Sequence, residues 1–154
     1  MIKIKEVFNL LKKNELRVST AESFTGGGIA SRIVSIAGAS DIFSLSLICY
    51  SNQAKMQLLG VSSETLTTYG AVSAQTVSEM LDGLEKIGQA DVVVATSGNA
   101  GPTAEKDDEV GVYYIGVMHN DKKLIRRYHH IGSRKQVIDN GISDSLDLIA
   151  EILR

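Results

Sequence analysis

Three polar turns hold the residues of this sequence that could do chemistry. The first contains Ser23 and Thr25 before three consecutive glycines, the second contains Lys55, and the third begins at Ser97. Glycines lack a Cβ atom, so backbone N–H groups around them can approach an anion or a developing oxyanion. A serine hydroxyl becomes a nucleophile when a neighbour takes its proton, and a lysine can do so once desolvation or nearby positive charge lowers its pKa. Lys55 is therefore a candidate base for an activated serine.

Each turn also has a purely structural interpretation. Ser23 or Thr25 can cap the helix that follows, with the glycines allowing tight packing. Lysines early in a helix are commonly solvated, which is the alternative for Lys55. Ser97 can supply a second hydroxyl to a proton relay, or it can begin a plain turn whose exit is set by Pro102. The residue types by themselves leave these alternatives open.

Alternating strand and helix patterns predict how the turns are positioned. We predict strands over 17–21, 43–50, 91–96, 110–119 and 123–130, and helices over 2–13, 29–36, 52–59, 73–87 and from 133 onward. The apolar run 43–50 indicates a buried strand containing Cys49, with a helix as the alternative for so short a run, and the β-branched run 91–96 indicates a strand buried on both faces. These elements predict an α/β fold. It is a three-layer α/β/α single domain over residues 1–154, with a mixed, mainly parallel sheet that ends in a hairpin.

Ligands of such folds bind beyond the carboxyl ends of the strands, where the three turns are expected. Arg134 follows a loop into the first turn of the last helix, from which its side chain could reach a phosphate. His119, His129 and His130 lack a metal-ligand spacing, so we predict no metal site. The acidic run 105–109 is expected to be a solvated loop.

Four short segments carry a more specific signal. They are Ala21-Glu22-Ser23 with Thr25-Gly26-Gly27, Tyr50-Ser51-Asn52 with Ala54-Lys55, Leu59-Gly60-Val61 with Gly70-Ala71-Val72-Ser73, and Ser97-Gly98 with Ala100-Gly101-Pro102. In order and spacing they resemble the motifs of the CinA C-terminal-domain family, whose active members are nicotinamide-nucleotide amidases. The resemblance covers nearly the whole chain.

The resemblance implies hydrolysis of nicotinamide mononucleotide to nicotinate mononucleotide and ammonia, without a cofactor. Ser23 would be the nucleophile, Lys55 its proton acceptor, and Tyr50 and Ser97 would orient groups or relay protons. Thr25 and the backbone at Gly26 and Gly27 would hold the oxyanion or substrate. The remaining residues expected to bind substrate are Asn52, Gly98, Gly101 and Arg134. Family members commonly self-associate, so a homo-oligomer is expected.

Several positions depart from the family pattern. Phe24 stands where a cysteine is usual, Asn99 replaces an aliphatic residue, and Asp108 and Glu109 replace a lysine and a proline in a loop. Two acids in contact with a substrate phosphate would repel it. The altered loops therefore favour an alternative function, a catalytically silent paralogue that binds a nucleotide or a protein partner.

Composition excludes several other classes. The 154 residues, 44% of them hydrophobic, suit one domain with its own core. Sixteen basic and 18 acidic residues give a formal charge of -2, which argues against binding to nucleic acid or an anionic membrane. The single Cys49 excludes an intramolecular disulfide and fits a reducing cytoplasm. No apolar run reaches the roughly 18 residues of a membrane span, and the N-terminal residues lack a signal-peptide core.

Overall fold

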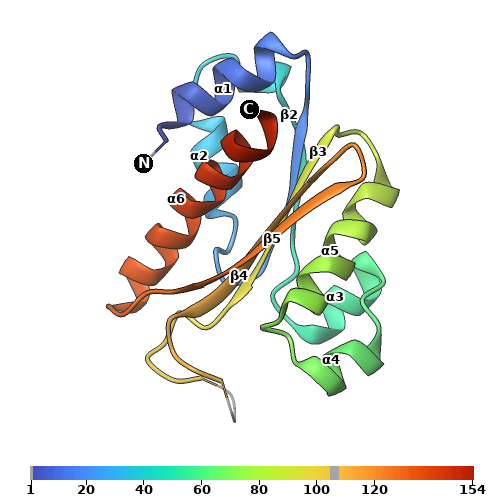
Figure 1. Ribbon diagram of the computed structural model, residues 1–154, viewed down its shortest axis with the longest axis vertical. Helices are drawn as coiled ribbons and strands as arrows, with labels where there is room; N and C mark the ends of the chain where they lie inside the picture. The colour runs from blue at the N-terminus through green and yellow to red at the C-terminus, as the bar shows by residue number, and fades with distance from the viewer. Residues whose placement is uncertain (1, 105–107) are drawn as a thin grey trace.

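The computed structural model describes residues 2–104 and 108–154, which form one mixed five-stranded sheet (Figure 1). The strand order is β2-β1-β3-β4-β5. The central strand β1 is parallel to its neighbours β2 and β3, whereas β4 is antiparallel to β3 and to β5. The strands are β1 (Val18–Glu22), β2 (Phe43–Ile48), β3 (Val92–Gly98), β4 (Val112–His119) and β5 (Lys122–His129).

Helices cover both faces of this sheet, which confirms the three-layer α/β/α prediction (Figure 1). One face is covered by α1 (Ile4–Lys13), α2 (Gly28–Val34) and α6 (Arg134–Leu153). The other face is covered by α3 (Asn52–Leu59), α4 (Ser63–Tyr69) and α5 (Ala74–Ile87). A short 3₁₀ helix (Ala39–Asp41) precedes β2.

Strand β3 contributes side chains to the apolar clusters on both faces of the sheet. Val92 and Val94 belong to the apolar cluster under α1, α2 and α6, whereas Val93 and Ala95 belong to the cluster under α5. Successive strand residues point to opposite faces, so a run of β-branched residues fits a strand that is covered on both sides. The prediction of two buried faces is confirmed.

Capping and turn residues account for several helix ends and for the hairpin. Ser73 and Ser133 cap α5 and α6 through their side chains, and Gly60 ends α3 with a φ of 69°. The hairpin between β4 and β5 turns through Asn120 and Asp121, which both have positive φ. Such turns match the right-handed twist of the paired strands. Caps and turns of this kind depend on a few neighbouring residues, so local sequence accounts for them.

Two elements differ from the sequence-based prediction. Strand β2 lies at the edge of the sheet and is half-buried, and Ile48 is 54% exposed, so the prediction of a buried strand is wrong. Cys49 is fully buried, but it lies just beyond the strand. Helix α4 was not predicted; it buries no residue completely and so shows no apolar periodicity.

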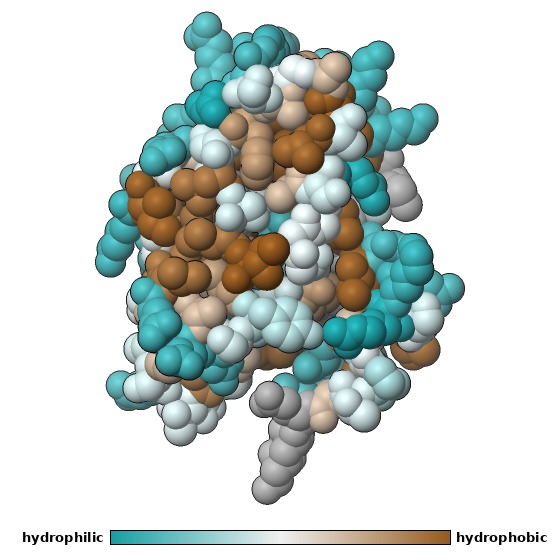
Figure 2. Space-filling model, turned by 180° about the vertical axis from the view of Figure 1, so that it is seen from behind, coloured by the Kyte–Doolittle hydropathy of each residue, from teal (hydrophilic) through white to brown (hydrophobic). Residues whose placement is uncertain are grey.

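On the face shown in Figure 2, apolar residues gather over the middle and hydrophilic residues lie mainly around the rim. The large apolar side chains that are exposed include Val34 on α2 and Ile48 on β2. Within the described ranges, no helix combines the length and hydrophobicity needed to span a membrane. Residues 105–107 of the acidic run lie outside the described residues, and Asp108 and Glu109 are exposed as expected.

Candidate active site

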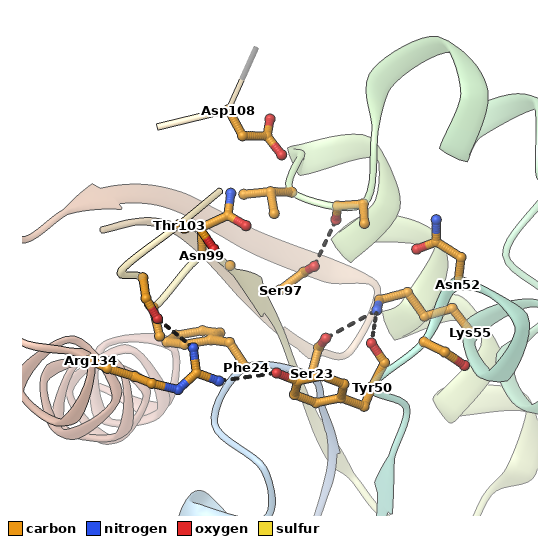
Figure 3. A pocket seen from close by; sticks show the side chains of 16 residues that line it. Ser23, Phe24, Tyr50, Asn52, Lys55, Ser97, Asn99, Thr103, Asp108 and Arg134 are labelled. Carbon is orange, nitrogen blue, oxygen red and sulfur yellow. Dashed lines mark hydrogen bonds between the residues drawn. The ribbon is translucent and has the colours of Figure 1, made fainter. Parts of the chain in front are cut away.

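The three polar turns meet at a cleft beyond the carboxyl ends of β1, β2 and β3 (Figure 3). Parallel strands end at the same edge of a sheet, so turns that are distant in sequence become neighbours there. The cleft encloses about 450 Å³, within the range of about 300–1,000 Å³ typical of small-molecule sites. Its lining includes Ser23, Tyr50, Lys55, Ser97 and Arg134.

Ser23 and Lys55 contact each other directly. The Nζ atom of Lys55 lies 3.0 Å from the Oγ atom of Ser23 and 3.3 Å from the backbone oxygen of Tyr50 (Figure 3). Lys55 lies in the first turn of α3, which begins where the Ser51 hydroxyl accepts a hydrogen bond from the Ala54 N–H. Only 1% of Lys55 is exposed, so the alternative of a solvated lysine is wrong.

A buried carboxylate, Glu22, holds the turn that presents Ser23. It is fully buried and accepts hydrogen bonds from the N–H groups of Ile29 and Ala30 at 2.9 and 3.0 Å. These donors belong to the first turn of α2, where the helix dipole favours a negative charge. The Thr25 hydroxyl also donates to Glu22, at 2.7 Å. In the sequence, Glu22 stands out only as part of a motif, although an acid between a strand and the start of a helix is a signal for this role.

The glycine turn is held by its own hydrogen bonds. The Gly26 N–H donates to the Ser23 carbonyl at 3.0 Å, and the Ser23 N–H donates to the Thr96 hydroxyl at 3.2 Å. The hydroxyls of Thr25 and Thr96 lie 3.0 Å apart. Over the described ranges, the cleft lining contains Ser23 but not Thr25, Gly26 or Gly27. Substrate contact by these three residues stays a prediction.

The third turn forms the opposite wall of the cleft. The Ser97 hydroxyl donates to the carbonyl of Ala71 at 2.7 Å, which joins the end of β3 to the segment before α5. Gly98 and Gly101 line the cleft, as does Asn52 from the second turn. Gly101 has a φ of 86°, and a Cβ atom there would come within 2.5 Å of Val110 Cγ1. The backbone of this turn therefore requires glycine at position 101.

Arg134 connects the second and third turns. Its guanidinium donates to the carbonyl of Gly101 at 2.6 Å and to the hydroxyl of Tyr50 at 3.1 Å (Figure 3). It is the first residue of α6, so three elements meet at this side chain. Tyr50 is 61% exposed, and its carbonyl and hydroxyl have different partners, Lys55 and Arg134.

Phe24 packs into the core beneath the cleft. Its ring centroid lies 4.9 Å from that of Tyr113, and Cβ atoms at Gly98 or Gly141 would press against the Phe24 ring. The Tyr113 hydroxyl donates to the carboxylate of Asp144. Burial, followed by this carboxylate, raises the pKa of Tyr113 far above its usual value. The residue after Ser23 is thus anchored by the aromatic core.

The thiol of Cys49, close to Lys55, is held in an unreactive form. Burial raises the pKa of the Cys49 thiol, and the positive charge of Lys55 opposes this effect only in part. The thiol is therefore held in its protonated, weakly nucleophilic form. In the part of the chain that the structure describes, no group of three or more His, Cys, Asp or Glu side chains is placed to hold a metal ion.

Comparison with known proteins places this arrangement in a family. Residues 3–153 match the family model described as the CinA C-terminal domain. The chain belongs to the CinA C-terminal domain family. It is 40% identical over 148 residues to a CinA-like protein of Kosmotoga olearia, covering 96% of this chain and 36% of that protein. A CinA-like protein of Endomicrobium trichonymphae is 43% identical over 141 residues, covering 91% of this chain and 33% of the relative.

Solved structures of the CinA superfamily share the fold. The competence-damaged protein (CinA) superfamily protein from Enterobacter cloacae matches with a TM-score of 0.95 and 33% identity, covering all of this chain and 94% of that chain. The competence/damage inducible protein from Agrobacterium tumefaciens has a TM-score of 0.92 and 32% identity, covering 98% and 96%. This CinA-family chain spans about a third of the length of the curated relatives that it matches.

Proposed function

We propose that this chain is an amidohydrolase that converts nicotinamide mononucleotide to nicotinate mononucleotide and ammonia. The observation that carries the proposal is the 3.0 Å contact between Lys55 Nζ and Ser23 Oγ in a cleft of ligand size. A serine and a buried amine at this distance form the nucleophile and base that amide hydrolysis needs. The choice of nucleotide rests on the resemblance of the four motifs to those of nicotinamide-nucleotide amidases.

Acylation begins with proton transfer from Ser23 to Lys55. Withdrawal of an amine from water disfavours its charged form, so the buried Lys55 is suited to start as a neutral base. As it takes the hydroxyl proton, Ser23 Oγ bonds to the carboxamide carbon and the carbonyl oxygen becomes an oxyanion. Collapse of this intermediate breaks the C–N bond, and the proton on Lys55 passes to the departing nitrogen, which leaves as ammonia.

Deacylation repeats the sequence with water. Lys55 takes a proton from a water molecule, whose oxygen attacks the ester formed on Ser23. The second intermediate breaks the bond to Ser23 Oγ, which regains a proton from Lys55, and the carboxylic acid product leaves and gives its proton to solvent. The Tyr50 carbonyl keeps the Lys55 amine directed at Ser23, while Glu22 and Thr96 hold the turn behind the nucleophile.

Ammonia release from nicotinamide mononucleotide tests the proposal, with the nucleotide product identified by chromatography. We expect turnover by the purified protein, at least about 10³-fold less with Ser23→Ala, and normal turnover with Ser40→Ala, a control at an exposed serine. Equal turnover by the Ser23→Ala protein, or none by the wild type, contradicts the proposal.

A silent nucleotide-binding paralogue is the second candidate, and the carboxylate of Asp108 on the cleft wall favours it. In that case nicotinamide mononucleotide raises the melting temperature while no ammonia appears. A strong preference for the phosphorylated form over nicotinamide riboside would show that Asp108 does not exclude phosphate. Self-association stays a prediction, which light scattering of the purified protein checks.

A further inference from the structure

Two polar side chains on one wall of the cleft, a buried amide nitrogen and an exposed carboxylate, have no hydrogen-bond partner among the residues that the structure describes. The amide nitrogen of Asn99, just beyond β3, is shielded from solvent and has no hydrogen-bond partner within residues 2–104 and 108–154. The carboxylate of Asp108 forms no hydrogen bond or ion pair with any residue that the structure describes. Figure 3 shows both side chains on the wall away from Lys55. A smaller hollow of about 140 Å³ adjoins the cleft and is also lined by Asn99 and Asp108, so the two residues lie together.

The two groups have complementary chemistry. The Asn99 amide nitrogen is a donor, and buried donors nearly always have a partner in folded proteins. The Asp108 carboxylate is an acceptor and repels an anionic phosphate. A hydroxyl group satisfies both, because its oxygen accepts a hydrogen bond while its O–H donates one. Carboxylates bind ribose hydroxyls in the same way in dinucleotide-binding folds.

Arg134 is the only basic side chain besides Lys55 among the described residues that line the cleft. Two of its nitrogen atoms donate to Gly101 and Tyr50, but a guanidinium has five N–H groups, so others remain for an anion. The cleft thus offers three chemically distinct regions. They are the serine–lysine pair, the Asn99 and Asp108 wall, and the Arg134 guanidinium.

We infer that Asn99 and Asp108 form a subsite for a sugar hydroxyl, so that the cleft takes a carboxamide whose ring carries a ribose. The amide of Asn99 donates to the hydroxyl oxygen, and that hydroxyl donates to the carboxylate of Asp108. An anionic group on the same ligand then lies toward Arg134. The inference rests on the proposed function and deepens it, since it names specificity-determining residues for the sugar.

Binding to the Ser23→Ala protein tests this subsite without turnover. Calorimetry compares nicotinamide mononucleotide with its 2′,3′-dideoxy analogue, which lacks only the two hydroxyls. Loss of hydrogen bonds that include a charged acceptor is expected to weaken binding about 10-fold. Adding Asp108→Ala or Asn99→Leu should reduce this ratio to less than about 3-fold. Glu64→Ala is the matched control, because it removes an exposed acid that lines neither the cleft nor the adjoining hollow.

Separate outcomes decide the two proposals. Equal binding of the two ligands to the Ser23→Ala protein overturns the subsite, and so does a Glu64→Ala effect as large as that of Asp108→Ala. Failure of both ligands to bind overturns it as well. Ammonia release by the wild type is measured in parallel. A protein that distinguishes the two ligands but releases no ammonia retains the subsite and loses the amidase function.

Discussion

The Lys55 Nζ atom lies 3.0 Å from the Ser23 Oγ atom, although 32 positions separate the two residues in the chain. Ser23 follows β1 and Lys55 lies in the helix after β2, and these strands are parallel neighbours. Their carboxyl ends therefore present both side chains at the same edge of the sheet. Both residues are buried, so the pair is held by the fold rather than by solvent-exposed side chains.

Lys55→Ala should lower kcat/KM about 10²- to 10⁴-fold, because Ser23 loses its base. Steady-state kinetics of the wild type and the Lys55→Ala protein measures this effect. Lys135→Ala, at a lysine whose side chain is 84% exposed, is the control and should leave kcat/KM unchanged. Unchanged turnover by the Lys55→Ala protein would remove this residue from the mechanism.

Glu22→Gln should destabilise the fold by about 2–3 kcal/mol, because the backbone N–H groups of Ile29 and Ala30 lose a charged acceptor. The turn that presents Ser23 is also loosened, so kcat should fall. Chemical denaturation and kinetics measure the two effects. Glu64→Gln, at an exposed acid in the first turn of α4, should cost less than about 1 kcal/mol. Equal losses for both variants would show that burial of Glu22 is unimportant.

Gly141→Ala should destabilise the protein by about 1–3 kcal/mol, because the new methyl group would press against the Phe24 ring. Displacement of Phe24 should also disturb the adjacent Ser23 and lower activity. The neighbouring Asn140→Ala serves as the control. In the Gly141→Ala/Phe24→Leu double variant, the smaller leucine side chain at position 24 should restore part of the stability that Gly141→Ala removes. Chemical denaturation of the wild type, the two single variants and the double variant measures this coupling. Strictly additive costs would mean that Gly141 and Phe24 do not interact.

The stabilising contribution of the Tyr113 hydroxyl should be lost at alkaline pH. Its raised pKa means that the folded state keeps the hydroxyl protonated, next to Asp144. That contribution is complete below about pH 10, the pKa of an unfolded tyrosine, and is lost as pH rises further, because the unfolded chain ionises first.

Denaturation of the wild type and Tyr113→Phe at several pH values measures this effect. The advantage of the wild type should shrink above about pH 10 by up to about 1.4 kcal/mol per pH unit. Tyr69→Phe provides the comparison at an exposed tyrosine. A stability difference that is the same at pH 8 and pH 11 contradicts the assignment.

The sequence by itself determined the local elements and the residue types of the site. The Val92–Val94 run, the capping residues Ser73 and Ser133, and Gly60 all act over a few neighbouring positions, so they are readable without a fold. The four motifs identified Ser23 and Lys55 in the same way, from residue types in a fixed order. The sequence did not predict helix α4, because this helix has no fully buried residues and therefore no recognisable apolar face.

Only the tertiary structure decided which of these groups meet. The edge position of β2 depends on strand order, which no pattern within residues 43–50 encodes. The burial of Glu22, the Lys55 contact with Ser23 and the bridge from Arg134 to Tyr50 join residues from different turns. Contacts of this kind arise from the packing of whole elements, because side-chain proximity across a sheet is set by strand pairing and not by local propensity.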